Sequence, residues 1–94
     1  MSARALVPTA AFGRAAKRLA KRRPEAAEAL RGALAALAAD AFAPALRTHK
    51  LHGELAGSWA CSAGYDLRVV FALAEHDGAE AIVLLSVGTH DEVY

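Results

Sequence analysis

The hydrophobic positions change their spacing near the middle of the chain, from the period of a helix to the alternation of β-strands. In the first half, Phe12 and Leu19 belong to an apolar stripe at helical spacing, and Thr9 precedes that stripe as a helix-capping residue. This pattern predicts a helix over residues 9–23. A short strand is expected ahead of it, over residues 4–7, where an apolar pair is followed directly by a proline.

A second helix is predicted to begin at Pro24. Proline suits the first turn of a helix, because the N–H that it lacks has no partner there. Leu30, Leu34 and Leu37 form the expected buried stripe, and residues 40–44 end the helix. Because the two helices follow each other so closely, we expect them to form an antiparallel hairpin.

The second half of the chain is typical of strands punctuated by glycines. Two short strands are predicted over residues 47–51 and 58–62, followed by a terminal hairpin that turns within residues 74–79. Helices followed by strands favour an α+β fold, here a helical hairpin packed on a mostly antiparallel, twisted sheet of about four to five strands. A chain of 94 residues is expected to form one domain, spanning residues 1–94.

The polar residues of the terminal hairpin lie where its strands end. Asp66 and Arg68 are two positions apart, so on a strand both side chains leave the same face, about 6.6 Å apart. The expected turn places Arg68 opposite Ser86 and Asp66 opposite Gly88, with His90 diagonally beside Asp66. The apolar face is predicted to contain Leu67, Val69, Phe71, Leu73, Val83, Leu85 and Val87. A slip by one residue would move charge into this face, which favours the predicted register.

The net charge of +1 conceals a strong asymmetry between the two halves of the chain. Residues 1–50 carry ten Lys or Arg and three Asp or Glu, whereas residues 51–94 carry one Arg and seven Asp or Glu. The basic half indicates either an anionic partner, such as nucleic acid or an acidic protein segment, or a solvated helix face.

Cysteine content and apolar run lengths indicate a cytoplasmic protein without membrane partners. Cys61 is the single cysteine and cannot form an internal disulfide. No apolar run is long enough to cross a bilayer. The first 23 residues lack acids and could pass for an organelle transit peptide, but the strand and helix predicted there are needed for the core.

Three blocks, which together span nearly the whole chain, carry a family resemblance. The most specific block combines residues 66–71, DLRVVF, with residues 83–94, VLLSVGTHDEVY. Residues 49–59, HKLHGELAGSW, form a second block, and residues 6–24 form the first. These blocks resemble the RelE/ParE superfamily of toxins from bacterial type II toxin–antitoxin systems, and most closely its YafQ-like branch of mRNA interferases.

This resemblance implies an endoribonuclease that cleaves mRNA, in the ribosomal A site as the family does. Cleavage without a metal needs a base for the 2′-hydroxyl, positive charge beside the phosphate and an acid for the leaving 5′-oxygen. His90 is the expected acid or base, because imidazole exchanges protons near neutral pH. Arg68 is the expected phosphate clamp, since guanidinium stays charged and offers paired donors. Without the family, His90 would be a residue of a frayed tail and Arg68 a salt-bridge partner of Asp66.

Three further residues are expected to assist catalysis. Asp66 beside Arg68 should have a lowered pKa, which makes it a poor base and favours a role in orienting His90. His49 matches the family's His-x-Leu position. Tyr94 matches its terminal aromatic residue, which either stacks on a base or packs on the sheet.

Contacts to RNA are expected from Arg47, Lys50 and the basic first helix. His52 is either a polar neighbour of this site or an ordinary loop residue. Residues 60–63, ACSA, supply no basic side chain, although many relatives carry one there. His49 and His52 do not complete a metal site, so neither a metal nor another cofactor is expected.

The resemblance also implies partners: a cognate antitoxin, the ribosome and mRNA, with DNA bound only indirectly through the antitoxin complex. Two other functions are compatible with the same fold. One is a ParE-like poison of DNA gyrase that catalyses nothing, and the other is an inactive toxin that only binds its antitoxin. The set of Asp66, Arg68, His90 and Tyr94 favours the nuclease, because a pure binder does not need to cluster these side chains.

Overall fold

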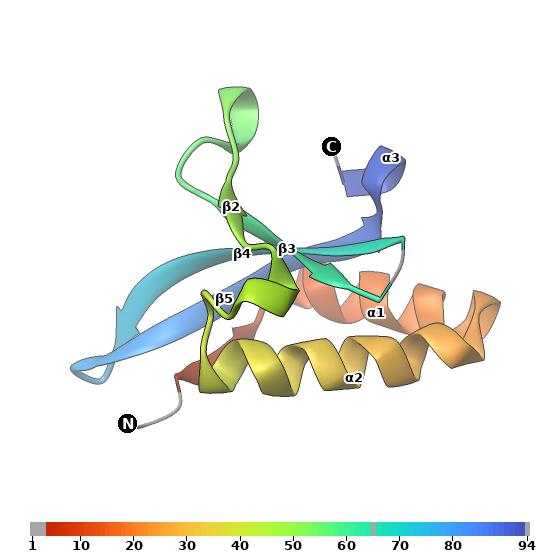
Figure 1. The fold of residues 1–94 in the computed structure, drawn as a ribbon, viewed down its shortest axis with the longest axis horizontal. Helices are drawn as coiled ribbons and strands as arrows, with labels where there is room; N and C mark the ends of the chain where they lie inside the picture. The colour runs from red at the N-terminus through yellow and green to blue at the C-terminus, as the bar shows by residue number, and fades with distance from the viewer. Residues whose placement is uncertain (1–3, 65, 94) are drawn as a thin grey trace.

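The computed structural model describes residues 4–64 and 66–93 of the chain. Two antiparallel helices cover one face of a twisted sheet, while a strand arm and a short terminal helix rise from the other face (Figure 1). The described strands are β1 (Ala5–Pro8), β2 (His49–Lys50), β3 (Trp59–Ala63), β4 (Leu67–His76) and β5 (Ala79–Thr89), in the spatial order β1-β5-β4-β3-β2.

The described helices are α1 (Ala10–Arg22), α2 (Pro24–Ala39) and α3 (His90–Val93), with single 3₁₀ turns η1 (Pro44–Leu46) and η2 (Gly53–Leu55). β1 pairs with β5 in parallel, and the other described strand pairs are antiparallel. The α+β fold predicted from the sequence, a helical hairpin on a mostly antiparallel sheet, is therefore confirmed.

The first helix begins where its sequence predicts. The hydroxyl of Thr9 accepts a hydrogen bond from the backbone N–H of Phe12 at 3.1 Å. The same hydroxyl donates to the carbonyl oxygen of Leu84 at 2.8 Å, which ties the start of α1 to β5. Phe12 and Leu19 point into the core. The cap therefore fixes both the start of α1 and its position against the sheet.

The second helix buries a stripe that differs in one position from the prediction. Leu30 and Leu37 are buried as expected, but Leu34 is only half-buried. Ala26 and Ala33 complete the buried stripe instead. The buried face of α2 therefore combines leucines with alanines.

The core lies between the two helices and the sheet. Its buried members are Phe12, Leu19, Ala26, Leu30, Ala33, Leu37, Ala41, Leu46, Cys61, Ala63, Leu67, Val69, Phe71, Ile82, Leu84 and Val87. Phe71 is the largest fully buried side chain and lies between Trp59 of β3 and Leu84 of β5. Truncating such a phenylalanine to alanine costs about 3–5 kcal/mol of stability.

The register of the β4–β5 hairpin differs from the predicted one. Arg68 lies opposite Gly88 rather than Ser86, and Asp66 precedes the strand instead of pairing within it. The first cause is the tight turn: Asp77 and Gly78, with φ angles of 54° and 79°, form a two-residue connection. The second cause is a β-bulge between Val70 and Phe71, which adds one residue on the β5 side.

The bulge also changes which side chains of β5 face the helices. Phe71 lies opposite Leu84, and both are buried, whereas Leu85 has no partner on β4. The prediction that Val83 and Leu85 face the core was therefore wrong, and Ile82 and Leu84 take those places. The predicted positions Leu67, Val69, Phe71 and Val87 are buried, while Leu73 near the hairpin turn is exposed.

The strand predicted over residues 47–51 is reduced to His49–Lys50. Arg47 ends η1 in the left-handed backbone region, with φ of 52°, and cannot continue an extended strand. Because β2 is so short, the edge of β3 at Ser62 is left uncovered by it. The uncovered part of β3 includes Ser62, which lines the candidate site.

Candidate functional site

The sheet face opposite α1 and α2 carries the sequence-predicted polar residues. The chain segment that contains β2 and η2 rises from this face beside β3, and α3 rises from it at the end of β5 (Figure 1). Ser62, Arg68 and Gly88 lie side by side across β3, β4 and β5, because they are direct partners in the sheet. Leu67 and Val69 point into the core, so Arg68 points to the open face.

Two arginines meet at a surface cavity on this face. The cavity has a volume of about 390 Å³ and is lined by Ala45, Arg47, Ser62, Gly64 and Arg68. Arg47 comes from the end of η1, which packs beside β3. Two guanidinium groups and a hydroxyl around one cavity form a site suited to an anion such as a phosphate.

The cavity combines two positively charged side chains, those of Arg47 and Arg68. Nη1 of Arg68 donates to the carbonyl oxygen of Leu67 at 2.8 Å, which directs the guanidinium along the strand. In the ranges 4–64 and 66–93, neither Arg47 nor Arg68 forms an ion pair with a carboxylate. The alternative that Arg68 serves as a salt-bridge partner of Asp66 is therefore wrong. The electrostatic field in the cavity favours an anionic ligand.

His49 is linked to the same cavity through Arg47. The Nδ1 atom of His49 lies 3.0 Å from the carbonyl oxygen of Arg47. A carbonyl oxygen only accepts hydrogen bonds, so Nδ1 carries the proton in this contact. A neutral imidazole with its proton on Nδ1 has its acceptor lone pair on Nε2. An imidazole in this tautomer can accept a proton at Nε2.

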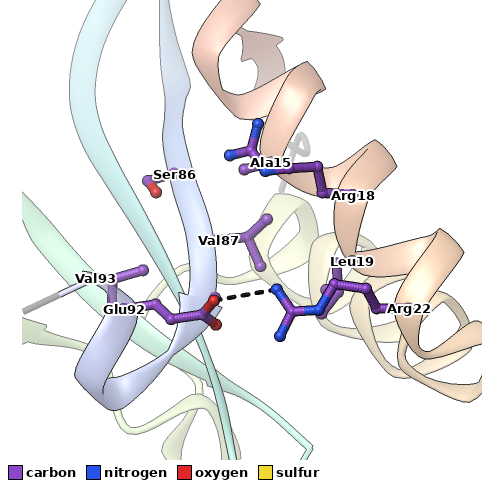
Figure 2. A pocket seen from close by; sticks show the side chains of 9 residues that line it. Ala15, Arg18, Leu19, Arg22, Ser86, Val87, Glu92 and Val93 are labelled. Atoms are coloured by element: carbon purple, nitrogen blue, oxygen red, sulfur yellow. Dashed lines mark hydrogen bonds and ion pairs between the residues drawn. The ribbon is translucent and has the colours of Figure 1, made fainter.

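The terminal helix α3 is fixed by Glu92, a residue that the hydrophobic pattern did not single out. Oε1 of Glu92 accepts from the backbone N–H of Thr89 at 2.9 Å. Oε2 of Glu92 lies 3.4 Å from Nη1 of Arg22 on α1 (Figure 2). The hydrogen bond from Thr89, with further help from Arg22, lowers the pKa of Glu92 below its ordinary value. The sequence signal was present as Thr-x-x-Glu at 89–92, the pattern of a capping box.

Gly88 allows α3 to lie this close to the sheet. A Cβ atom at position 88 would approach Cβ of Glu92 to 3.1 Å and Cγ1 of Val93 to 3.3 Å. These distances are tighter than ordinary side-chain contacts. A larger residue would therefore require Glu92 and Val93 of α3, which packs on β4 and β5, to shift by a few tenths of an ångström.

His90 is the first residue of α3 and follows Thr89, the partner of Leu67 on β4. Its side chain is 64% exposed, and Nδ1 lies 3.7 Å from a carboxylate oxygen of Asp91. The predicted placement of His90 on an extended strand beside Asp66 was wrong, because the helix begins at His90. The histidine instead stands at the border of the open face, where solvent and a ligand can reach it.

Asp66 is directed away from the other predicted site residues. Its carboxylate accepts two hydrogen bonds from Arg23, at 2.8 Å and 3.4 Å, and does not orient His90. The pKa of Asp66 lies below its ordinary value, as expected, but the main cause is the hydrogen bond from Arg23. Arg68 makes only the smallest contribution to that shift. Asp66 therefore anchors the start of β4 to the junction between α1 and α2.

The remaining predicted residues lie apart from the two-arginine cavity. Lys50 lies opposite Trp59, and its Nζ stands 5.4 Å from the centre of the indole ring. His52 is exposed on the segment that leads into η2. Tyr94 lies outside the described residues. The structure thus brings Arg47 and Arg68 together with Ser62, links His49 to the backbone carbonyl of Arg47, and leaves Lys50 and His52 outside the cavity.

Neither a metal centre nor a membrane span is found in the described part of the chain. Within residues 4–64 and 66–93, no group of three or more His, Cys, Asp or Glu could hold a metal ion. No helix in the same ranges is both long and apolar enough to span a bilayer.

Comparisons with known proteins agree with this architecture. A family model described as "Bacterial toxin of type II toxin-antitoxin system, YafQ" matches residues 4–94. No curated protein sequence matches the chain significantly.

Three solved structures illustrate the similarity of fold. A YoeB/ParE toxin from Agrobacterium tumefaciens has a TM-score of 0.75 and 16% identity, over 92% of this chain and 98% of that chain. A mutant of YafQ from E. coli has a TM-score of 0.75 and 17% identity, over 97% of this chain and 98% of that chain. The E. coli DinJ-YafQ toxin-antitoxin complex has a TM-score of 0.69 and 17% identity, covering 97% of each chain.

Proposed function

Because the chain belongs to the YafQ family of toxins from bacterial type II toxin–antitoxin systems, we propose that it is an endoribonuclease that cleaves mRNA. The proposed reaction is attack of a ribose 2′-hydroxyl on the adjacent phosphate. The 2′-oxygen forms a bond to phosphorus, the bond to the 5′-oxygen breaks, and a 2′,3′-cyclic phosphate remains. Residues 1–94 would act as one toxin domain, without a cofactor.

The observation that carries this proposal is the cavity between Arg47 and Arg68. Its guanidinium groups form no ion pair with carboxylates of residues 4–64 and 66–93, and Ser62 on β3, the sheet partner of Arg68, lines the same cavity. A scissile phosphate bound in this cavity would meet positive charge on two sides. That charge would stabilise the extra negative charge of the phosphorane as the 2′-oxygen attacks.

Two histidines supply the proton transfers in this proposal. Nε2 of His49 accepts the proton from the 2′-hydroxyl, since Nδ1 is engaged with the carbonyl oxygen of Arg47. His90, at the other border of the open face, donates a proton to the leaving 5′-oxygen. Asp66 acts indirectly, through Arg23, by holding the start of β4. Tyr94 remains the expected aromatic residue for stacking on a base.

The proposed partners follow from the family. The E. coli YafQ in one similar structure is bound to the antitoxin DinJ, and a RelBE2 toxin-antitoxin complex from Mycobacterium tuberculosis has a related fold. We therefore propose a cognate antitoxin as the protein partner, and mRNA on the ribosome as the substrate. DNA would be bound only through the antitoxin complex. The proposed substrate implies a cytoplasmic location.

The decisive experiment maps the 5′ ends of transcripts after brief induction of the chain in a host that lacks the antitoxin. We expect new 5′ ends within coding regions, and their loss in Arg68→Ala and His90→Ala variants. Arg31→Ala, an exposed position on α2, is the matched control and should cleave normally. DNA breaks without new 5′ ends would instead indicate a gyrase poison. Unimpaired growth with intact transcripts would indicate a toxin that only binds its antitoxin.

A further inference from the structure

Arg47 has a backbone conformation that residues with a Cβ atom rarely adopt. Its φ and ψ angles are 52° and 41°, in the left-handed region. Within residues 4–64 and 66–93, the one other non-glycine residue with a positive φ is Asp77, which lies in the β4–β5 turn, where such angles are usual. Arg47 lies in no hairpin turn, and strained residues of this kind cluster at active sites and ligand clamps.

The neighbouring residues hold Arg47 in this conformation. Leu46 precedes it and is buried in the core. The N–H of Arg47 donates a hydrogen bond to the carbonyl oxygen of Pro44 at 3.2 Å. Thr48 follows, and its hydroxyl donates to the carbonyl oxygen of Ala41 at 2.5 Å. The chain is therefore anchored before, at and after Arg47, as a strained conformation requires in order to persist.

The left-handed turn brings Arg47 into contact with two parts of the candidate site. Arg47 lines the cavity together with Arg68, and its carbonyl oxygen lies 3.0 Å from Nδ1 of His49. In a regular strand, carbonyls point within the sheet toward the neighbouring strand, whereas side chains stand roughly perpendicular to the sheet. An extended Arg47 would therefore not direct its carbonyl oxygen at the ring of His49.

Strand pairing places His49 on the same face of the sheet as this cavity. His49 lies opposite Ala60 on β3, so their side chains share a face. Ala60 and Ser62 are two positions apart on β3 and also share that face, and Ser62 lines the cavity. The imidazole of His49 therefore leaves the sheet on its open face, the face that carries Arg68.

We propose that Arg47 is a positioning residue for His49: its left-handed backbone aims the carbonyl oxygen at Nδ1 and keeps the proton of the neutral ring there. The hydrogen bond that one ring nitrogen makes determines which nitrogen carries the proton, so this contact leaves Nε2 as the acceptor. The inference rests on the proposed endoribonuclease for the role of Nε2, but the tautomer itself can be measured without RNA.

Nitrogen-15 NMR of the imidazole rings measures the tautomer in the full chain at pH 8, where an ordinary histidine is neutral. The signals of His49 are those that are missing from the spectrum of His49→Gln. We expect the proton on Nδ1 in the parent chain, in Arg47→Gly and in Arg47→Ala. In Arg47→Val the ratio of the Nδ1–H to the Nε2–H form should fall about tenfold, because a residue branched at Cβ resists the left-handed region.

The matched control for backbone strain is Asp77→Val. It places the same branched residue at a φ of 54°, in a turn that does not line the cavity, and should leave the tautomer of His49 unchanged. A proton on Nε2 of His49 in the parent chain would overturn the proposal. Equal tautomer ratios in Arg47→Ala and Arg47→Val would overturn it as well.

Single-turnover cleavage of RNA separates the positioning role from the loss of the guanidinium. Arg47→Ala and Arg47→Val both lack the guanidinium, so both should cleave more slowly than the parent chain. Arg47→Val should be slower than Arg47→Ala by a further factor of about ten. This factor should vanish when both variants also carry His49→Gln, because the effect acts through the imidazole. A factor that persists with His49→Gln would show a general structural effect and overturn the proposal.

The outcome can be separated from the proposed function. The expected tautomers without any RNA cleavage would retain the contact between Arg47 and His49 and remove the nuclease. Normal transcript cleavage, with a tautomer that does not respond to Arg47→Val, would remove the positioning role and leave the nuclease intact.

Discussion

Arg23 and Asp66 join the turn between α1 and α2 to the loop before β4, with 2.8 Å between Nη1 of Arg23 and Oδ2 of Asp66. The same guanidinium also contacts Glu25 at 3.2 Å. One arginine thus fastens the end of the helical hairpin to the sheet just before Arg68. The contact explains why an aspartate next to the candidate site takes no direct part in it.

This contact predicts a dependence of stability on pH. The pKa of Asp66 is lowered in the folded chain, first by its hydrogen bond from Arg23. The stabilisation that Asp66 provides is therefore complete above the pKa that this residue has in the unfolded chain. It is lost as the pH falls through the lower pKa that Asp66 has in the folded chain. Asp66→Asn should reduce the urea midpoint at pH 7, and the difference from the parent chain should shrink in acid.

The matched control for this prediction is Glu28→Gln, which removes an exposed pair with Arg31 within α2. Its urea midpoint should stay close to that of the parent chain at both pH values. A difference between Asp66→Asn and the parent that persists unchanged into strong acid would contradict the assigned role of Arg23.

Arg68→Ala is expected to lower the rate of RNA cleavage about 10²–10³-fold, the usual loss when one donor to a developing oxyanion is removed. Arg68→Lys should recover only part of that loss, because lysine keeps the charge but not the paired donors. Single-turnover cleavage rates measure both effects, and urea unfolding checks that the fold is retained. Arg31→Ala on α2 is the control. A twofold effect or less for Arg68→Ala would remove this residue from the proposed mechanism.

Gly88→Ala should displace α3, because the added Cβ would lie 3.1 Å from Cβ of Glu92 and 3.2 Å from its Oε1. We expect faster amide exchange at Thr89, whose N–H donates to Glu92. We also expect the rate of RNA cleavage to fall by a larger factor than the folding equilibrium constant. Gly13→Ala is the matched control, since a Cβ there meets nothing within 4 Å. It should stabilise α1 by about 0.5–1 kcal/mol. Unchanged exchange at Thr89 in Gly88→Ala would show that α3 tolerates the methyl group.

Cys61 should be chemically inert in the folded chain. Its side chain is fully buried on β3, and burial raises the pKa of the thiol to about 11. At pH 8 only about one thiol in a thousand is then ionised, and thiolate is the reactive form. Ellman's reagent should react slowly with the native chain and completely in guanidinium chloride. Rapid reaction under native conditions would contradict the buried position of this residue.

The fold class and the helical hairpin could be predicted because their signals are local. Thr9 caps α1 and Pro24 opens α2, as their chemistry in the sequence indicates. Of the candidate residues, Arg47 and Arg68 line one cavity, and His49 contacts the backbone carbonyl of Arg47. The capping pattern of Thr89 and Glu92 is equally local and indicates the helical start at His90, although strand alternation alone extends β5 through that position.

The register of the β4–β5 hairpin and the ion pair between Arg23 and Asp66 could not be predicted from such local signals. The two-residue turn and the β-bulge between Val70 and Phe71 together move the partner of Arg68 from Ser86 to Gly88, although each strand looks regular in the sequence. Strand alternation therefore predicted the wrong face for Val83 and Leu85. Burial of Ile82 and Leu84 against the helices is a property of the assembled layers.

The sequence by itself determined which segments are helical, which are extended, and which family the chain resembles, because caps, periodicity and blocks of residues act over short distances along the chain. Only the tertiary structure decided that Arg47 meets Arg68, and that Asp66 binds Arg23 across 43 positions. The physical reason is that such contacts depend on how the layers pack. A bulge, a left-handed residue at Arg47 or a glycine under a helix can redirect a side chain without altering the pattern of hydrophobic and polar positions.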